Sequence, residues 1–169
     1  MSLANCLRLL FPSAVENPTP LELIRTCKDA NLFDGGGLSP SALFALCQHA
    51  GGKMTGVTVE ISPKGRAENL APGSLMYVNS LELLNAQGRN KFKTRKNEKD
   101  SHVVLVEEIL RNGTIVVINP DQALNESGSG FLESHWGRMN IPFDSLEKVW
   151  QSKRFDQTTT TRCAISLVI

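Results

Sequence analysis

Three residues of this chain have the types and the order that thiol-based catalysis requires. Cys6 begins a short apolar run, CLRLLF, for which Asn5 is placed to act as helix N-cap. His102 opens the apolar stretch HVVLVEEIL, and Asn119 ends the next apolar stretch just before a proline. A helix N-terminus and a neighbouring imidazolium both lower the pKa of a thiol from its usual value of roughly 8.5. We therefore take Cys6, His102 and Asn119 as candidate nucleophile, general base and orienting residue.

The other cysteines fit structural positions. Cys27 and Cys47 fall within apolar helical stripes, and Cys163 alternates into an apolar strand. Buried thiols of this kind are usually inert, which leaves Cys6 as the nucleophile candidate. The alternative is that Cys6 is a small apolar residue packing in the first helical turn. No C-x-x-C pair occurs, which excludes a zinc ribbon and a thioredoxin-like redox motif.

The spacing of the candidate base and its orienting residue depends on a hairpin. A two-residue turn at Asn112-Gly113 would pair Asn119 with Val106. His102 and Asn119 would then share a sheet face but lie four residues apart along the strands. A turn shifted toward Leu110-Arg111 would bring them opposite each other. The alternative is that His102 simply starts a strand and Asn119 forms a turn with the proline that follows.

A second acidic or amide side chain competes for the role of orienting residue. Asp121 lies two residues after Asn119 and shares its face if the strand continues past Pro120. Proline cannot donate to a strand ladder and often ends a strand, so we favour Asn119 over Asp121.

The composition is that of an ordinary folded domain. The chain has 169 residues, of which 41% are hydrophobic, and 18 Lys and Arg balance 17 Asp and Glu. This length predicts one domain, and the near-zero net charge argues against a globally basic nucleic-acid binder. No apolar run approaches the roughly 20 residues of a membrane span, and no secretory signal is visible. We expect a soluble protein with reduced thiols, either cytoplasmic or exported without a conventional signal peptide.

The elements that must position these residues are helices first and strands afterwards. Thr19-Pro20-Leu21-Glu22 is a strong helix start, Ser39-Pro40 begins another helix, and Gly51-Gly52 ends it. Strands are expected in five later segments, and a short helix over 143–151; the strand segments are 57–61, 75–78, 102–110, 114–119 and 161–169. This order predicts an α+β fold with a mainly antiparallel sheet.

The order of parts resembles the papain-like cysteine peptidases, especially the compact bacterial branch similar to bacteriocin-processing peptidases. In that family the nucleophilic Cys begins the central helix, the His opens a strand of pattern His-Val-Val-x-Val, and an Asn-Pro or Asp-Pro ends the next strand. Here those positions are Cys6, His102 and Asn119. The resemblance implies a single papain-like domain over 1–169, with a helical part over about 5–52 and a sheet part over about 55–169.

One departure from the family concerns the oxyanion hole. Papain-like enzymes use a Gln about six residues before the nucleophile to stabilise the oxyanion. Only five residues precede Cys6 here, and none is Gln. Two explanations are open: residues before Met1 were removed from a longer chain, or Met1 to Asn5 replace part of the missing segment, with Asn5 as the candidate donor. Losing such a donor typically lowers the rate by about 10²–10³.

Two long loops complete the candidate surface. The segment 88–101 is rich in Lys and Arg, but a solvated loop is a better interpretation than a nucleic-acid site. The segment 121–140 is rich in Gly and Ser. Its His135 and Trp136 are candidates for lining a substrate cleft, and the alternative is a surface aromatic anchor. His49 lies near a helix end, where a capping or dipole role is expected. No spacing of ligand residues matches a metal site, and no cofactor is expected.

The sequence therefore leads to one function and one alternative. The first is a cysteine peptidase or amide-bond hydrolase acting on a peptide or protein substrate, with Cys6, His102 and Asn119 as its triad. The alternative is a catalytically inactive papain-like module that binds a protein or nucleic-acid partner through its basic loop. The missing upstream Gln favours the alternative.

Overall fold

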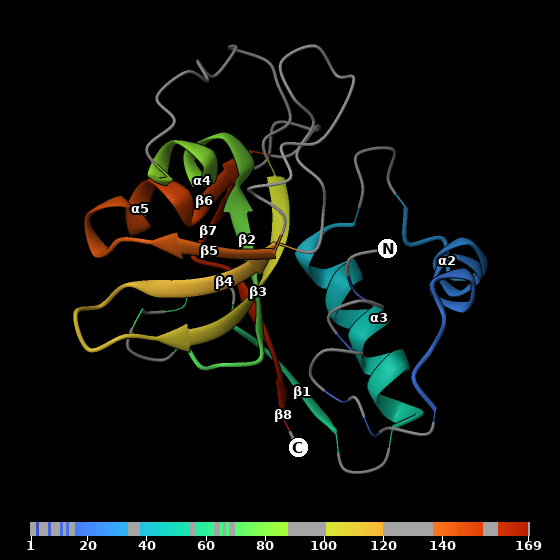
Figure 1. Cartoon of the computed structure of the whole chain (residues 1–169). Helices are drawn as coiled ribbons and strands as arrows, with labels where there is room; N and C mark the ends of the chain where they lie inside the picture. The colour runs from blue at the N-terminus through green and yellow to red at the C-terminus, as the bar shows by residue number, and fades with distance from the viewer. Residues whose placement is uncertain are drawn as a thin grey trace.

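The computed structural model describes Leu3, Leu7, Phe11, Ser13 and residues 16–33, 38–54, 57–62, 65, 67, 70–87, 101–119, 137–153 and 159–168. Helices pack on both sides of a six-stranded sheet in which every described pairing is antiparallel (Figure 1). The predicted α+β class is therefore confirmed. No helix in the described part of the chain has the length and apolar character needed to cross a membrane.

The two N-terminal helices begin where their capping residues predict. Helix α2 (Pro20–Asp29) follows a complete capping box, in which the Thr19 hydroxyl accepts from the Glu22 N–H and the Glu22 carboxylate accepts from the Thr19 N–H. Helix α3 (Pro40–Gly52) starts after Ser39, whose hydroxyl accepts from the Ala42 N–H. Proline occupies the first position of both helices, where its missing N–H costs nothing.

The main sheet has the strand order β1-β8-β2-β3-β4-β5. Its strands are β1 (Thr58–Ser62), β2 (Ser74–Asn79), β3 (Ser101–Ile109), β4 (Ile115–Asn119), β5 (Gly137–Ile141) and β8 (Ala164–Val168). A two-stranded sheet is formed by β6 (Gln151–Lys153) and β7 (Thr159–Thr161). The last strand returns between β1 and β2, so the chain's two halves share one sheet.

Several elements were not foreseen from the sequence. Helix α4 (Ser80–Ala86) follows β2 directly, because the Asn79 side chain accepts from two N–H groups of its first turn. We interpreted the segment 121–140 as a loop, but β5 begins at Gly137. The predicted helix over 143–151 is a 3-10 turn, η3 (Phe143–Ser145), followed by a single turn, α5 (Leu146–Val149).

The sheet separates two hydrophobic cores. The α2–α3 core lies on one face and contains Leu3, Leu7, Phe11, Leu23, Cys27, Leu43, Leu46, Cys47, Ala50, Met54, Leu75, Tyr77, Leu105, Cys163, Ile165 and Leu167. The α4–α5 core lies on the other face and contains Leu70, Met76, Val78, Leu83, Leu84, Val104, Val106, Ile115, Val117, Met139, Ile141, Leu146, Val149, Trp150 and Ala164. Neighbouring strand residues alternate between the two cores, so β2 and β3 are apolar on both faces.

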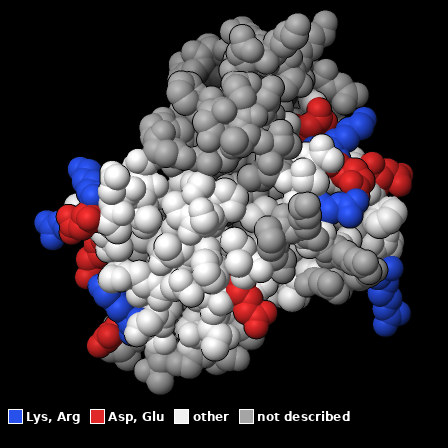
Figure 2. All heavy atoms as spheres, turned by 180° about the vertical axis from the view of Figure 1, so that it is seen from behind, with Lys and Arg blue, Asp and Glu red and all other residues white. Residues whose placement is uncertain are grey.

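Charged side chains are mixed on the surface. On the rear face, Lys and Arg lie among Asp and Glu, and no region of a single sign stands out among the described residues (Figure 2). This mixture agrees with the near balance of 18 basic and 17 acidic residues. It offers no broad basic surface, on this face, of the kind that phosphate backbones attract.

Candidate functional site

A hydrogen bond joins two of the three predicted site residues. The distance between His102 Nε2 and Asn119 Oδ1 is 2.7 Å. Because the amide oxygen can only accept, the ring nitrogen donates, and Nδ1 is left as the unprotonated nitrogen of the neutral ring. Asn119 is buried, with 4% of its surface exposed, whereas His102 is half-buried. The pair thus presents an oriented imidazole whose other nitrogen can accept a proton.

The pair lies where four strands of the main sheet begin or end. His102 is the second residue of β3 and pairs with Val78 near the end of β2, while Asn119 is the last residue of β4 and pairs with Gly137, the first residue of β5. Helix α4 starts at the same end, directly after Asn79. Ends of strands are where a sheet can present polar side chains without cutting into the apolar core.

The hairpin that sets the spacing differs from the two-residue turn that we predicted. Leu110 N–H donates to the Thr114 carbonyl at 2.9 Å, and Gly113 N–H donates to the Leu110 carbonyl at 2.9 Å. The loop therefore has three residues, and Gly113 has φ +81°. A three-residue hairpin loop commonly ends in a left-handed residue, for which glycine is favoured. The predicted pairing of Asn119 with Val106 is wrong for this reason.

A bulge in β3 then shifts the register a second time. Glu107 has no paired residue on β4, because the pairing between the two strands shifts between Val106 and Glu108. The pairs on the two sides of the bulge are Ile109 with Ile115, Glu108 with Val116, Val106 with Val117, and Leu105 with Ile118. One further step places Asn119 opposite Val104. His102 and Asn119 are thus diagonal neighbours on one face, a separation that a histidine side chain can bridge.

The remaining predicted site residues lie outside the described part of the chain. These are Cys6, Asn5, Asp121, His135 and Trp136. The distance between the Cys6 sulfur and the His102 ring, which we expected to be about 4–5 Å, thus stays a prediction. The basic segment from Gly88 to Asp100 also lies outside the described residues.

Two described neighbours of Cys6 bear on its setting. Leu3 and Leu7 are both helical and buried in the α2–α3 core, and Phe11 N–H donates to the Leu7 carbonyl at 2.8 Å. Helical structure at Leu3 precedes the N-cap that we predicted at Asn5.

Strand alternation places the His102 and Asn119 side chains on the face of the sheet that carries the α4–α5 core. Val103 and Leu105 pack with the α2–α3 core, whereas Val104 packs with the α4–α5 core. Because side chains alternate along a strand, His102 points to the side of Val104. The described residues Leu3 and Leu7, which belong to the α2–α3 core, therefore lie on the opposite side of the sheet from the His102 side chain.

The other three cysteines are all buried, as predicted. Burial raises the pKa of Cys163 to about 11, and it also raises the pKa of Cys27, an effect that the positive N-terminus partly opposes. A raised pKa keeps a thiol neutral and weakly reactive near pH 7. Cys47 is fully buried in α3, and its exposed fraction is 0%. The predicted positions of these cysteines in apolar stripes are confirmed.

The other predictions concern single residues and metal sites. His49 is exposed in the last turn of α3, where we expected a role at a helix end. Over the ranges that the structure describes, His, Cys, Asp and Glu side chains form no group of three or more that could hold a metal ion.

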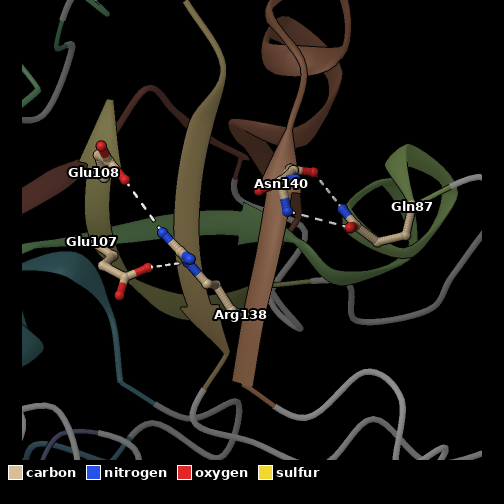
Figure 3. Close-up of polar contacts among 5 residues, drawn as sticks. All are labelled: Gln87, Glu107, Glu108, Arg138 and Asn140. Atoms are coloured by element: carbon tan, nitrogen blue, oxygen red, sulfur yellow. Dashed lines mark hydrogen bonds and ion pairs between the residues drawn. The ribbon is translucent and has the colours of Figure 1, made fainter. Parts of the chain in front are cut away.

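A polar network beside the bulge was not foreseen. Arg138 on β5 reaches across β4 and contacts Glu107 and Glu108 on β3 (Figure 3). On the outer edge of β5, the Gln87 side chain donates to the Asn140 carbonyl and accepts from the Asn140 N–H. Neither contact has a signal in the sequence, because each joins elements far apart in the chain.

No family model, no curated protein and no solved structure matches this chain. The geometry of the candidate site is therefore the basis for its functional interpretation.

Proposed function

We propose that the protein is a papain-like cysteine hydrolase of peptide or other amide bonds, in which Cys6 is the nucleophile, His102 the general base and Asn119 the orienting residue. The observation that carries the proposal is the hydrogen bond of 2.7 Å between His102 Nε2 and Asn119 Oδ1. A buried amide that fixes one ring nitrogen defines the tautomer and leaves the other nitrogen for proton transfer.

The reaction follows from that tautomer. The Cys6 thiol gives its proton to His102 Nδ1, and the sulfur forms a bond to the carbonyl carbon of the substrate. The resulting oxyanion collapses, the C–N bond breaks, and His102 returns the proton to the leaving amine. Water then attacks the thioester with His102 as base, which releases the carboxylic acid and regenerates the thiol. Asn119 keeps its contact with Nε2 throughout.

The proposal also sets a geometric requirement. Alternation places His102 on the face of the α4–α5 core, whereas Leu3 and Leu7 belong to the α2–α3 core. His102 is one residue from the start of β3, where a side chain can turn past the end of the sheet. The reacting sulfur and ring nitrogen must therefore meet at this end and not across the sheet.

A test of the proposal combines labelling with hydrolysis. Iodoacetamide at pH 6 should modify Cys6 alone and rapidly, because its thiolate is stabilised there, while Cys27, Cys47 and Cys163 stay protected by burial. Mass spectrometry identifies the labelled cysteine. Incubation with a mixture of peptides should give cleavage products, and Cys6→Ala should give none. Equally slow labelling of all four thiols would contradict the proposal.

The second candidate function is a non-catalytic binding module of the same fold. Two observations favour it: Leu3 is helical before the predicted start at Cys6, and alternation directs His102 away from the core that holds Leu3 and Leu7. In that case Cys6 packs in a helix, and the His102–Asn119 hydrogen bond stabilises the end of the sheet. The two candidates differ in the labelling rate of Cys6 at pH 6, which is high only for the hydrolase.

A further inference from the structure

The bulge at Glu107 decides whether the His102–Asn119 pair exists. If β3 continued from Glu108 without a bulge, Glu107 would pair with Val117, and Asn119 would lie opposite Leu105. His102 is three residues from Leu105, an odd number, so the two side chains would point to opposite faces of the sheet. With the bulge, they share a face. One extra residue therefore brings the imidazole and the amide together.

Arg138 holds both acidic residues at this bulge. Its Nε donates to Glu107 Oε2 at 2.6 Å, and its Nη2 donates to Glu108 Oε2 at 3.3 Å (Figure 3). Neighbouring residues of a regular strand point to opposite faces, so a single side chain on one face could not reach both. At a bulge the two side chains point to similar sides, and the double contact is specific to this backbone geometry.

The position of Arg138 links the bulge to the pair. Arg138 pairs with Ile118 on β4, which is the residue before Asn119. The Gln87 side chain fixes the outer edge of β5 through both backbone groups of Asn140. Arg138 is thus attached to a fixed strand, and its side chain crosses β4 to the bulge, next to the end of β4 that carries Asn119.

A second contact fixes the backbone of the bulge from the other side. Gly73 N–H donates to the Val106 carbonyl at 2.8 Å. Gly73 follows Pro72 in a turn closed by the Ser74 N–H and the Ala71 carbonyl, and its φ is +90°. A proline followed by a left-handed glycine is the pattern of a type II turn. The bulge thus has a backbone contact on the β2 side and a side-chain contact on the β5 side.

We infer that Arg138 is a positioning residue for His102: through Glu107 and Glu108 it stabilises the bulge that places the imidazole beside Asn119. The inference rests on the proposed function only for its consequence in catalysis. The structural effect itself concerns the His102–Asn119 hydrogen bond, which exists whether or not the protein turns over a substrate. Both carboxylates and the guanidinium are solvent-exposed, with exposed fractions of 39%, 52% and 62%, so a substitution here leaves both cores intact.

Nuclear magnetic resonance of the histidine rings gives a direct test. Long-range proton–nitrogen spectra of the wild-type protein should show His102 as the Nε2–H tautomer, with a slowly exchanging ring proton. In Arg138→Ala, exchange of that proton with water should become about two- to fivefold faster, because an exposed ion-pair network adds only modest stability to the bulge. Arg138→Lys should show a smaller increase in the exchange rate than Arg138→Ala, because it keeps the positive charge.

Two further variants separate this inference from a general effect of charge. The double variant Glu107→Gln/Glu108→Gln should reproduce the faster exchange, since it removes the same contacts from the other side. Arg111→Ala, which removes an exposed cation from the turn of the same hairpin, should leave the exchange rate unchanged. A wild-type exchange rate in Arg138→Ala, with the Nε2–H tautomer intact, would overturn the inference.

The outcome for the wild-type protein distinguishes this inference from the proposed function. A slow Nε2–H proton that is insensitive to Arg138 contradicts the positioning role alone. A wild-type His102 without a protected Nε2–H contradicts both, because the hydrogen bond to Asn119 is then missing. Fast exchange in Arg138→Ala together with an unreactive Cys6 supports the positioning role and contradicts the hydrolase.

Discussion

The two ends of the β3–β4 hairpin are built from different chemistry. At the turn, Ile109 pairs with Ile115, Gly113 adopts a positive φ of +81°, and the aromatic ring of Phe143 lies against that glycine. At the open end, His102 and Asn119 form a polar pair where β3 begins and β4 ends. The turn determines which residues of β3 and β4 pair next to it. The bulge then shifts this pairing by one residue before the strands reach His102 and Asn119. Substitutions at the turn should therefore affect stability, and substitutions at the open end should affect reactivity.

The largest effect on stability is expected from the apolar residues next to the turn. Ile115 is 1% exposed, so Ile115→Ala should lower the free energy of unfolding by about 2–5 kcal/mol through lost burial and a cavity. Urea denaturation measures this difference. Ile24→Ala on the exposed side of α2 is the matched control and should change stability by less than about 1 kcal/mol. Similar losses in both variants would show that the hairpin packs no better than the surface.

The turn itself should be less sensitive than the core below it. A Cβ at Gly113 would lie 3.0 Å from Phe143 Cδ2, and the positive φ disfavours any other residue. Gly113→Ala should therefore destabilise the fold by about 1–2 kcal/mol. At Gly52, in α3, a Cβ would meet nothing within 4 Å. Gly52→Ala should be neutral or stabilising by up to about 1 kcal/mol, and a loss there equal to that at Gly113 would contradict this explanation.

At the open end the balance between stability and reactivity should reverse. Asn119→Ala removes the hydrogen bond to His102 but little apolar surface, and should cost only about 0.5–1.5 kcal/mol of stability. The rate of Cys6 alkylation at pH 6, and any hydrolysis, should fall by about tenfold or more, because the base loses its orientation. Asn119→Asp should keep much of the activity, since a carboxylate also accepts from the imidazole N–H.

The competing residue Asp121 provides the control for this prediction. Asp121→Ala should leave alkylation and hydrolysis unchanged. Loss of turnover in Asp121→Ala, with normal turnover in Asn119→Ala, would mean that Asn119 is not the orienting residue.

A pH-dependent effect is expected from a thiol at neither end of the hairpin. Burial raises the pKa of Cys163 to about 11, so the folded protein retains a proton that the unfolded chain releases at lower pH. The stabilising contribution is therefore full below the unfolded pKa of roughly 8.5 and is lost as the pH rises from there toward 11. Urea denaturation should show this decline, and Cys163→Ala should show a smaller one. An identical decline in both proteins would contradict it.

Local signals in the sequence were sufficient for most of the fold. The capping box at Thr19 and the serine–proline start at Ser39 predicted α2 and α3, because capping depends on residues three positions apart. The hairpin was also recognised, since its two apolar stretches flank a glycine. Helix α4 and the strands β5, β6 and β7 were missed. Each is only three to seven residues long, and a tertiary contact of Gln87 with Asn140 holds α4 against β5.

The candidate site could be predicted in part. The residue types and their parity along the strands placed His102 and Asn119 on one face of the sheet, but four residues apart along the strands. Their spacing could not be predicted, because the bulge at Glu107 depends on Arg138 and Gly73, which are distant in sequence. The three-residue turn and the bulge each shift the register by one residue, which makes two residues in total. His102 and Asn119 therefore still share a face, as predicted, although Asn119 is not opposite Val106.

The central claim is that His102 activates Cys6, and the pH dependence of Cys6 alkylation tests it most directly. In the wild-type protein, the alkylation rate should rise at a pH well below the roughly 8.5 of a free thiol, within the range of about 3.5–7.5 found for activated cysteines. In His102→Ala, the rise should return to roughly 8.5, whereas His49→Ala, which alters an exposed histidine on α3, should behave as wild type. If the alkylation rate of the wild-type protein rises only near pH ~8.5, and His102→Ala does not change this pH, His102 does not activate Cys6.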